Sequence, residues 1–137
     1  MLNCFNIHLT DDEIKNISNL GLAHLGDAVY ELMVRSWLCK NGGSTSKGLH
    51  HAAVSYVAAP SQAKAVEKIM PHLSDEEKAV YKRGRNTKVN SVPHRATLEE
   101  YHAATGFEAL FGYIYLHGDL ERLNTLFDII MEENHAS

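Results

Sequence analysis

Three acidic side chains in otherwise apolar stretches are the residues of this 137-residue chain best suited to chemistry. Asp27 and Glu31 stand four residues apart in LAHLGDAVYE, so they share one face of a helix. Glu108 stands in YHAATGFEALFGY, with Thr105 three positions before it on the same face. Burying a carboxylate is costly unless it is paired or binds a cation. The pattern therefore indicates either ion pairs or a metal site.

Glycines beside these carboxylates suggest how Asp27 and Glu108 could meet. Gly26, Gly106 and Gly112 each lower helix propensity by ~1 kcal/mol, and the close approach of two helices is a sufficient reason to keep them. A crossing at the glycines would bring both carboxylates to one hard cation. Mg²⁺ is commonly held by one or two carboxylates, with water and substrate phosphate in the other positions. The alternative is that each carboxylate pairs with a nearby Arg, Lys or His.

Basic residues are concentrated between positions 78 and 95, although the whole chain has a net charge of −4. This segment holds six basic residues and no acidic one, so the rest of the chain carries −10. Glycine, asparagine and proline from position 84 onward predict a loop over 84–95. Basic side chains on a long loop can reach phosphates, whereas the alternative is a solvated loop that complements a helix C-terminus. The basic residues are Lys78, Lys82, Arg83, Arg85, Lys88 and Arg95.

Composition excludes several classes of protein. With 45% hydrophobic and 22% charged residues, the chain is neither disordered nor fibrous, and its length fits one domain. No apolar run approaches the ~20 residues of a membrane span, and the N-terminus lacks the pattern of a secretory signal. Cys4 and Cys39 have no metal-ligand spacing and are typical of reduced thiols. We expect a cytoplasmic protein with no membrane association.

Hydrophobic periodicity and capping signals predict helices throughout the chain. No stretch alternates long enough for a credible strand, so we expect an all-α fold. The apolar face of the second helix is predicted at Leu22, Leu25, Val29 and Leu32. Residues 1–137 are expected to form a single domain of about seven helices. They are predicted near 10–20, 22–40, 47–59, 60–71, 74–83 and 97–117, and from 119 onward.

The motifs that carry these candidate residues resemble those of a known family. Residues 25–31 (LGDAVYE) resemble the signature helix of the ribonuclease III catalytic domain, and residues 107–112 (FEALFG) resemble its second catalytic segment. Together with residues 82–86 (KRGRN) and 61–63 (SQA), they are similar to Mini-ribonuclease III, the compact bacterial branch of that family. The resemblance covers roughly residues 20–126.

The resemblance implies a homodimeric, all-helical endonuclease that cuts double-stranded RNA with Mg²⁺, for which Mn²⁺ can substitute. Within this branch the implied substrate is a precursor of 23S ribosomal RNA, whose ends the enzyme matures. A separate double-stranded-RNA-binding domain is not expected, and whether a ribosomal protein presents the RNA stays open. Asp27 matches the signature aspartate, and Glu108 matches the glutamate that binds the catalytic metal.

Two departures from the family pattern reduce the expected ligand set. Larger members have a glutamate where this chain has Leu20 and an aspartate where it has Thr105, so four carboxylates become two. Thr105 could hold a metal-bound water through its hydroxyl. Glu31 is a second candidate for the outer shell, but an i,i+4 ion pair with Arg35 competes with that role.

The basic segment supplies the candidate RNA contacts, since an A-form duplex is recognised mainly through phosphates and 2′-hydroxyls. Two other functions remain open from the sequence. The chain could be a non-catalytic RNA-binding homologue, or a helical protein-interaction module in which Asp27 and Glu108 are ion-paired. The candidate RNA-binding residues are Lys82, Arg83, Gly84, Arg85, Asn86, Lys88 and Arg95.

Overall fold

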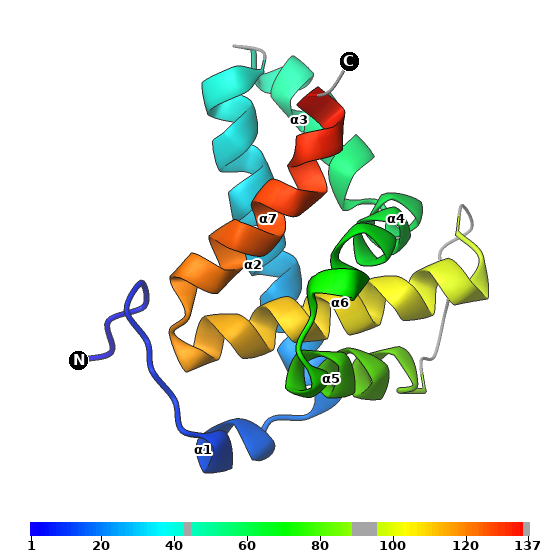
Figure 1. Ribbon diagram of the computed structural model, residues 1–137. Helices are drawn as coiled ribbons and strands as arrows, with labels where there is room; N and C mark the ends of the chain where they lie inside the picture. Colours follow the sequence, from blue (N-terminus) through cyan, green and yellow to red (C-terminus); the bar gives the residue numbers. More distant parts are fainter. Residues whose placement is uncertain (43–44, 89–95, 136–137) are drawn as a thin grey trace.

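The computed structural model describes residues 1–42, 45–88 and 96–135, and these residues form helices and no strand (Figure 1). The prediction of an all-α fold is therefore confirmed. Within the described part of the chain, none of the helices has the length and hydropathy needed to cross a membrane. The elements are α1 (Asp11–Lys15), α2 (Asn19–Asn41), α3 (Ser46–Val57), α4 (Ala59–Ile69), the 3₁₀ turn η1 (Met70–His72), α5 (Asp75–Arg85), α6 (Leu98–His117) and α7 (Leu120–His135).

Capping boxes begin three of these helices where the sequence predicted them. In each box a Ser or Thr side chain accepts a hydrogen bond from the third helical N–H, and the Glu at that position accepts one from the capping residue. Gly118 ends α6 with a φ of 82°, a left-handed conformation that favours glycine. The three boxes are Thr10 with Glu13, Ser74 with Glu77, and Thr97 with Glu100.

Two predicted boundaries were wrong. The first helix ends at Lys15, because Ser18 caps a new helix by accepting a hydrogen bond from the N–H of Gly21. Leu20 therefore belongs to α2. The fifth helix continues through Gly84 to Arg85, past its predicted end near residue 83, and residues 89–95 of the predicted loop lie outside the described residues. Packing of Gly84 against a neighbouring helix outweighs the low helix propensity of glycine there.

Helix α6 is the centre of the fold. It contacts α1, α2, α4, α5 and α7, and Figure 1 shows it passing between α4 and α5. A helix that is covered from several directions is expected to be apolar around most of its circumference. The sequence of α6 agrees, because ten of its residues, from Ala104 to Leu116, are buried. Residues of α6 therefore touch nearly every other element, which makes this helix a suitable base for a site.

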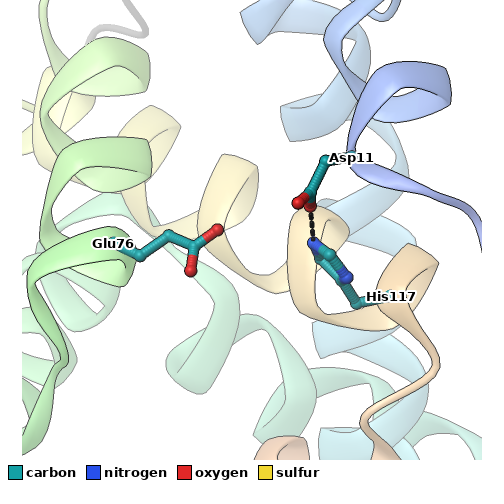
Figure 2. A group of neighbouring side chains, drawn as sticks. All are labelled: Asp11, Glu76 and His117. Atoms are coloured by element: carbon teal, nitrogen blue, oxygen red, sulfur yellow. Dashed lines mark ion pairs between the residues drawn. The ribbon is translucent and has the colours of Figure 1, made fainter.

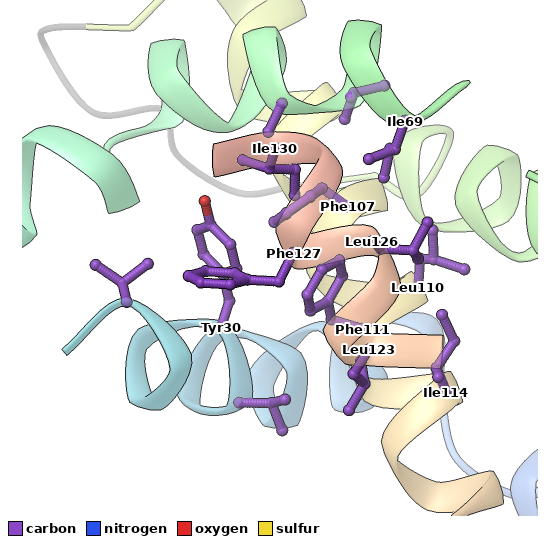
Figure 3. Packing of buried hydrophobic residues seen from close by; sticks show 14 of the residues in the cluster. Tyr30, Ile69, Phe107, Leu110, Phe111, Ile114, Leu123, Leu126, Phe127 and Ile130 are labelled. Carbon is purple, nitrogen blue, oxygen red and sulfur yellow. The ribbon is translucent and has the colours of Figure 1, made fainter. Parts of the chain in front are cut away.

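Four aromatic rings hold α2, α6 and α7 together (Figure 3). The ring of Tyr30 packs edge-on against Phe107 and Phe111, with centroids 4.8 and 5.4 Å apart. Phe127 of α7 adds a third edge contact to Tyr30 at 6.1 Å. Edge-to-face pairs of this kind contribute ~0.5–1.5 kcal/mol each beyond the apolar area that they bury. Tyr30 lies three residues after Asp27, so this core fixes the helix turn that carries the carboxylate.

The buried face of α2 differs from the predicted one. Leu22 and Val29 are buried as expected, but Tyr30 and Val34 complete the face, and Leu32 is 53% exposed. At least one apolar residue of α2, Leu32, therefore points away from the core of this chain. The spacing of apolar residues in the sequence alone did not distinguish the face of α2 that is buried in the core from the face that carries Leu32.

A charged pair joins α5 to α7. Arg122 donates two hydrogen bonds of 2.8 Å to the carboxylate of Glu77, and a third of 2.7 Å to the backbone oxygen of His72. The hydrogen bond and charge of Arg122 hold the pKa of Glu77 below its usual range despite burial. Bidentate geometry of this kind is among the stronger charged interactions in proteins. Glu77 therefore both completes a helix cap and links two helices.

Candidate active site and its carboxylates

Helices α2 and α6 cross with their backbones in contact. A Cβ atom on Gly26 would overlap the carbonyl oxygen of Glu108 and would lie 2.7 Å from the amide nitrogen of Gly112. A Cβ atom on Gly112 would likewise overlap the carbonyl oxygen of Leu22. Only glycine permits this approach, which places the residue after Gly26 directly beside Glu108.

The carboxyl groups of Asp27 and Glu108 meet at this crossing. Asp27 is exposed and Glu108 is half-buried. Burial raises the pKa of Glu108 to about 8, and the negative charge of Asp27 adds to the shift. A hydrogen bond between the two carboxyl groups acts in the same direction, because it exists only while one of them keeps its proton. Without a cation, Glu108 therefore keeps its proton near neutral pH.

Gln62 of α4 is the third member of the site, and the sequence did not single it out as a functional residue. Its side chain is 1% exposed, and its amide nitrogen donates to Glu108 Oε2 at 3.3 Å and to the carbonyl of Val57 at 2.9 Å. The donation to Glu108 opposes the rise of its pKa. The sequence did contain a signal for Gln62. This polar residue stands at helical spacing from the apolar residues Ala65, Val66 and Ile69, which share its buried face of α4.

These side chains fit a hard divalent cation. Asp27 and Glu108 supply two carboxylates, and within the described residues neither forms an ion pair with Lys, Arg or His. The amide oxygen of Gln62 is buried and has no hydrogen-bond partner there. A cation with its bound water would neutralise the two carboxylates and give that oxygen a donor. The chemistry of the donors therefore agrees with a metal site of the Mg²⁺ type.

The other two predicted members of the site have partners of their own. Glu31 accepts a hydrogen bond of 2.9 Å from Arg35, so the competing ion pair is present. Thr105 is buried, and its hydroxyl donates to the carbonyl of Tyr101 at 2.9 Å. Leu20, at the position where larger family members have a glutamate, is 45% exposed in the first turn of α2. An outer-shell role for Thr105 or Glu31 stays a prediction.

Most of the predicted RNA-binding residues that the structure describes lie at a helix end rather than in a loop. Lys82, Arg83 and Arg85 are exposed on the last turn of α5, and Asn86 is its C-cap. Lys88 follows and is also exposed, while Arg95 lies outside the described residues. Positive charge at a helix C-terminus is favourable in itself, by ~0.3–1 kcal/mol per group. Their position is thus compatible with both a structural and an RNA-binding role.

Gly84 has a structural role that the sequence did not reveal. A Cβ atom there would lie 2.8 Å from the Cβ of Ala109 and 2.9 Å from the Cα of Gly106. Gly84 is buried at this second crossing, between α5 and α6, so it is not placed on the surface with the basic side chains. Gly106 was expected at the crossing with α2, but its nearest neighbour is Tyr81 of α5.

The raised pKa of Glu108 predicts how the stability of the metal-free protein depends on pH. Because this pKa is higher in the folded chain, the folded state binds the proton more tightly. The stabilisation is complete below the ordinary pKa of 4.5 and is lost as the pH rises through about 8. At about 1.4 kcal/mol per pKa unit, the shift from 4.5 to about 8 corresponds to a loss of roughly 5 kcal/mol in unfolding free energy across this range.

Urea denaturation of wild type and Glu108→Gln, both in EDTA, measures this loss. The stability of the wild type relative to the variant should fall as the pH rises from 4.5 to about 8. Added Mg²⁺ should restore the stability of the wild type at the upper end. Parallel curves for the two proteins would show that Glu108 titrates normally and that the carboxyl pair is not coupled.

Comparison with known proteins identifies the class. The family model described as "Ribonuclease III domain" matches residues 20–119, which include Asp27, Gln62 and Glu108. The chain is 41% identical over 124 residues to a Mini-ribonuclease 3 of Thermoanaerobacter sp. (strain X514), an alignment that covers 90% of this chain and 87% of the relative. It is 48% identical over 105 residues to a Mini-ribonuclease 3 of Symbiobacterium thermophilum, covering 77% of this chain and 81% of the relative.

The fold agrees with these relationships. A crystal structure of a protein from Fusobacterium nucleatum matches with a TM-score of 0.81 at 32% identity, over 88% of this chain and 93% of that one. The fold and the family match together define an endoribonuclease domain of the ribonuclease III class. The chain belongs to the ribonuclease III family, in its Mini-ribonuclease III branch.

Proposed function

We propose that this protein is a Mg²⁺-dependent endonuclease that cuts double-stranded RNA and also accepts Mn²⁺. The observation that carries the proposal is the meeting of Asp27 and Glu108 at a glycine crossing, with no cationic partner for either among the described residues. Two carboxylates held this close, one of them half-buried, repel each other when both are ionised. A divalent cation relieves that repulsion.

The chain's own residues have distinct tasks in this mechanism. Asp27 and Glu108 hold the cation, and Gln62 orients Glu108 through the hydrogen bond to its Oε2. When bound, the cation supplies an activated water and neutralises charge on the leaving 3′ oxygen of the scissile phosphate. Glu108 releases its proton when the cation binds, so metal affinity rises with pH up to about 8. No side chain has to act as a covalent nucleophile.

The proposed contact with the RNA backbone is the exposed basic end of α5 and the residues that follow it, namely Lys82, Arg83, Arg85, Asn86 and Lys88. Phosphate contacts dominate duplex binding and make it depend on salt. The charge distribution supports this surface, since the net acidity of the chain lies outside positions 78–95. Arg95 is proposed as an additional contact.

Replacing Arg83 and Arg85 together by Ala should weaken duplex binding and reduce its dependence on salt. Each lost phosphate contact makes the negative slope of log K against log salt concentration shallower by about 1. Fluorescence anisotropy of a labelled RNA duplex in EDTA measures binding without cleavage. Lys40→Ala, an exposed lysine at the end of α2, is the matched control and should leave the slope unchanged. An unchanged slope for the double variant would place the RNA contact elsewhere.

An apolar groove beside the site supports a homodimer. It encloses about 320 Å³ and includes Leu32, Leu120 and Phe5, which are 53%, 40% and 73% exposed. Leu25 and Ala28, on either side of Asp27 in α2, line the same groove. Two copies joined here by a two-fold axis would place two cleavage sites on one duplex, one for each strand.

Leu32→Glu should convert the dimer to a monomer, because it places a charge in the middle of this apolar surface. Sedimentation velocity at several protein concentrations measures the change. Leu98→Glu replaces a leucine that is 56% exposed and outside the groove, and it should leave the dimer intact. A monomeric wild type, or a dimer that survives Leu32→Glu, would contradict the assignment of this surface.

We further propose that residues 1–137 act as one catalytic unit in the cytoplasm, and that the substrate is a precursor of 23S ribosomal RNA. The match to relatives of the Mini-ribonuclease III branch supports this substrate. A ribosomal protein is a candidate partner for presenting the RNA. Comparing cleavage of precursor transcripts with and without ribosomal proteins tests both points, and uncut precursor under every condition would remove the proposed substrate.

The deciding experiment is incubation with Mg²⁺ and a long RNA duplex at low salt. We expect cleavage of the duplex and none of single-stranded RNA or duplex DNA. Binding without cleavage would support the rival reading of a non-catalytic RNA-binding homologue. Neither binding nor cleavage would support the reading of a helical protein-interaction module.

A further inference from the structure

A second group of metal-ligating side chains lies outside the candidate active site. Asp11 at the start of α1, Glu76 in the first turn of α5 and His117 at the end of α6 each place a ligand atom within 4.8 Å of the others. His117 Nε2 lies 3.0 Å from Asp11 Oδ1. Figure 2 shows Glu76 extending from its helix toward this pair. Three separate elements therefore converge on one point.

The surroundings of this group leave its negative charge only partly neutralised. The Tyr113 hydroxyl donates to Glu76, while burial and the nearby charges of Glu76 and Asp11 raise the pKa of Tyr113. Arg83 acts on Tyr113 in the opposite direction and lines the adjoining cavity together with Lys15. The nearby Arg122 is already engaged by Glu77. Two carboxylates and a phenol thus share one small region of the surface.

The imidazole of His117 supplies the nitrogen ligand atom of this group. Its Nε2 is buried from solvent, and although it is close to Asp11, it completes no hydrogen bond of good geometry with any described residue. A cavity of about 290 Å³, lined by Glu76, Tyr113 and His117, opens beside it. A buried polar atom without a hydrogen-bond partner is rare in proteins and calls for an explanation, such as a bound ion.

We propose that Asp11, Glu76 and His117 form a Zn²⁺ site. The imidazole nitrogen of His and the carboxylate oxygens of Asp and Glu are all ligands that Zn²⁺ takes in proteins, and the imidazole distinguishes this group from the all-oxygen sites that Mg²⁺ prefers. Asp11 and Glu76 are exposed, so water completes the coordination. The site is separate from the carboxylate pair, because Glu108 and His117 are nine residues apart on one helix, about 13 Å along its axis.

The site would fasten the N-terminal segment to the helical core. Helix α1 has only five residues, and a backbone hydrogen bond of 2.7 Å from Leu9 to Leu116 lies next to it. An ion shared by α1, α5 and α6 would hold this segment against the start of α5 and the end of α6. Binding to the folded state alone stabilises a protein in proportion to the logarithm of the ion concentration.

Calorimetric titration with ZnCl₂ tests the proposal in a full-length background that lacks the carboxylate pair of the candidate active site and the two exposed cysteines. This background carries Asp27→Asn and Glu108→Gln, together with Cys4→Ser and Cys39→Ser to remove the exposed thiols. We expect one equivalent of Zn²⁺ to bind, and His117→Gln to weaken binding at least tenfold. His50→Gln, an exposed histidine in α3, is the matched control and should bind as the background does.

The melting temperature supplies a second measurement, which protects the test against a variant that folds poorly. Zn²⁺ should raise the melting temperature of the background and have no effect on Glu76→Gln, whose substitution lies on the surface. Absence of a bound equivalent in the background would overturn the proposal. Binding that is unchanged in both His117→Gln and Glu76→Gln would also overturn it, because the ion would then lie elsewhere.

Discussion

Asp27→Asn and Glu108→Gln are each expected to lower the rate of RNA duplex cleavage more than about 100-fold, while the fold stays intact. Loss of partners outside the first coordination shell of a metal already costs ~10–100-fold, so loss of a direct carboxylate ligand should cost more. Both changes keep the size of the side chain and remove only its charge. Initial rates with saturating Mg²⁺ and a long duplex measure the effect.

Measuring the stability of the two variants distinguishes the metal site from the alternative in which Asp27 and Glu108 are paired with basic residues. Removing one member of an ion pair leaves a charge without its partner and destabilises the fold. Here the opposite is expected, because burial and Asp27 already disfavour the charged form of Glu108. At neutral pH without metal, Glu108→Gln should therefore unfold at an equal or higher urea concentration than wild type.

Glu31→Gln is the matched control for the activity measurement. Glu31 lies on the same helix as Asp27, four residues later, and its carboxylate accepts a hydrogen bond from Arg35. An exposed i,i+4 pair contributes only ~0.3–0.5 kcal/mol. Glu31→Gln should thus retain most of the cleavage rate. Equal losses for Glu31→Gln and Asp27→Asn would mean that Glu31 also takes part in metal binding.

Gly26→Ala should be the most destabilising small substitution in the chain's signature helix. Its Cβ would overlap the carbonyl oxygen of Glu108, a backbone atom of another helix that no rotamer change can move. Overpacking of a close contact typically costs ~1–3 kcal/mol and more when backbone must shift, which outweighs the ~1 kcal/mol gain in helix propensity. We expect a net loss of about 3 kcal/mol or more in urea denaturation.

The same substitution should also abolish cleavage, because separating α2 from α6 moves Asp27 away from Glu108. Gly21→Ala is its control on the same helix, where the added Cβ would meet only side-chain atoms of Ile17 and Ser18, both at 3.1 Å. That variant should stay within about 1 kcal/mol of wild type. Similar stabilities for the two variants would show that the helices do not cross at Gly26.

The local signals of the sequence were sufficient to place most of the helices approximately and to single out Asp27 and Glu108 as candidates. Capping boxes at Thr10, Ser74 and Thr97 act over four residues, so their hydrogen bonds can be inferred without knowledge of the fold. Glycines in the middle of apolar helices are a local cost that requires a tertiary reason, and this predicted the crossing beside Asp27. The distribution of charge is likewise a local signal, and it distinguished the basic segment at positions 78–95 from the acidic rest of the chain.

Only the tertiary structure decided which elements meet. Gln62 reaches Glu108 across 46 positions of sequence, and its contact with Glu108 became evident only from the packing of α4 against α6. Gly106 and Gly112, six residues apart, turned out to serve different crossings, because successive faces of α6 contact different helices. The convergence of Asp11, Glu76 and His117 has no signal in sequence spacing at all.

The difference between what the sequence determined and what only the tertiary structure decided has a physical cause. Caps, helix propensity and charge runs depend on neighbours within one or two turns, and the chain contains those neighbours in order. Burial, a raised pKa and a shared ligand position depend on atoms that folding brings together from distant segments. The sequence by itself thus determined that Asp27 and Glu108 are unusual carboxylates in an all-helical chain. The crossing of α2 with α6 brings the two carboxyl groups together, because the backbones touch at Gly26, the residue before Asp27, and at Glu108 itself.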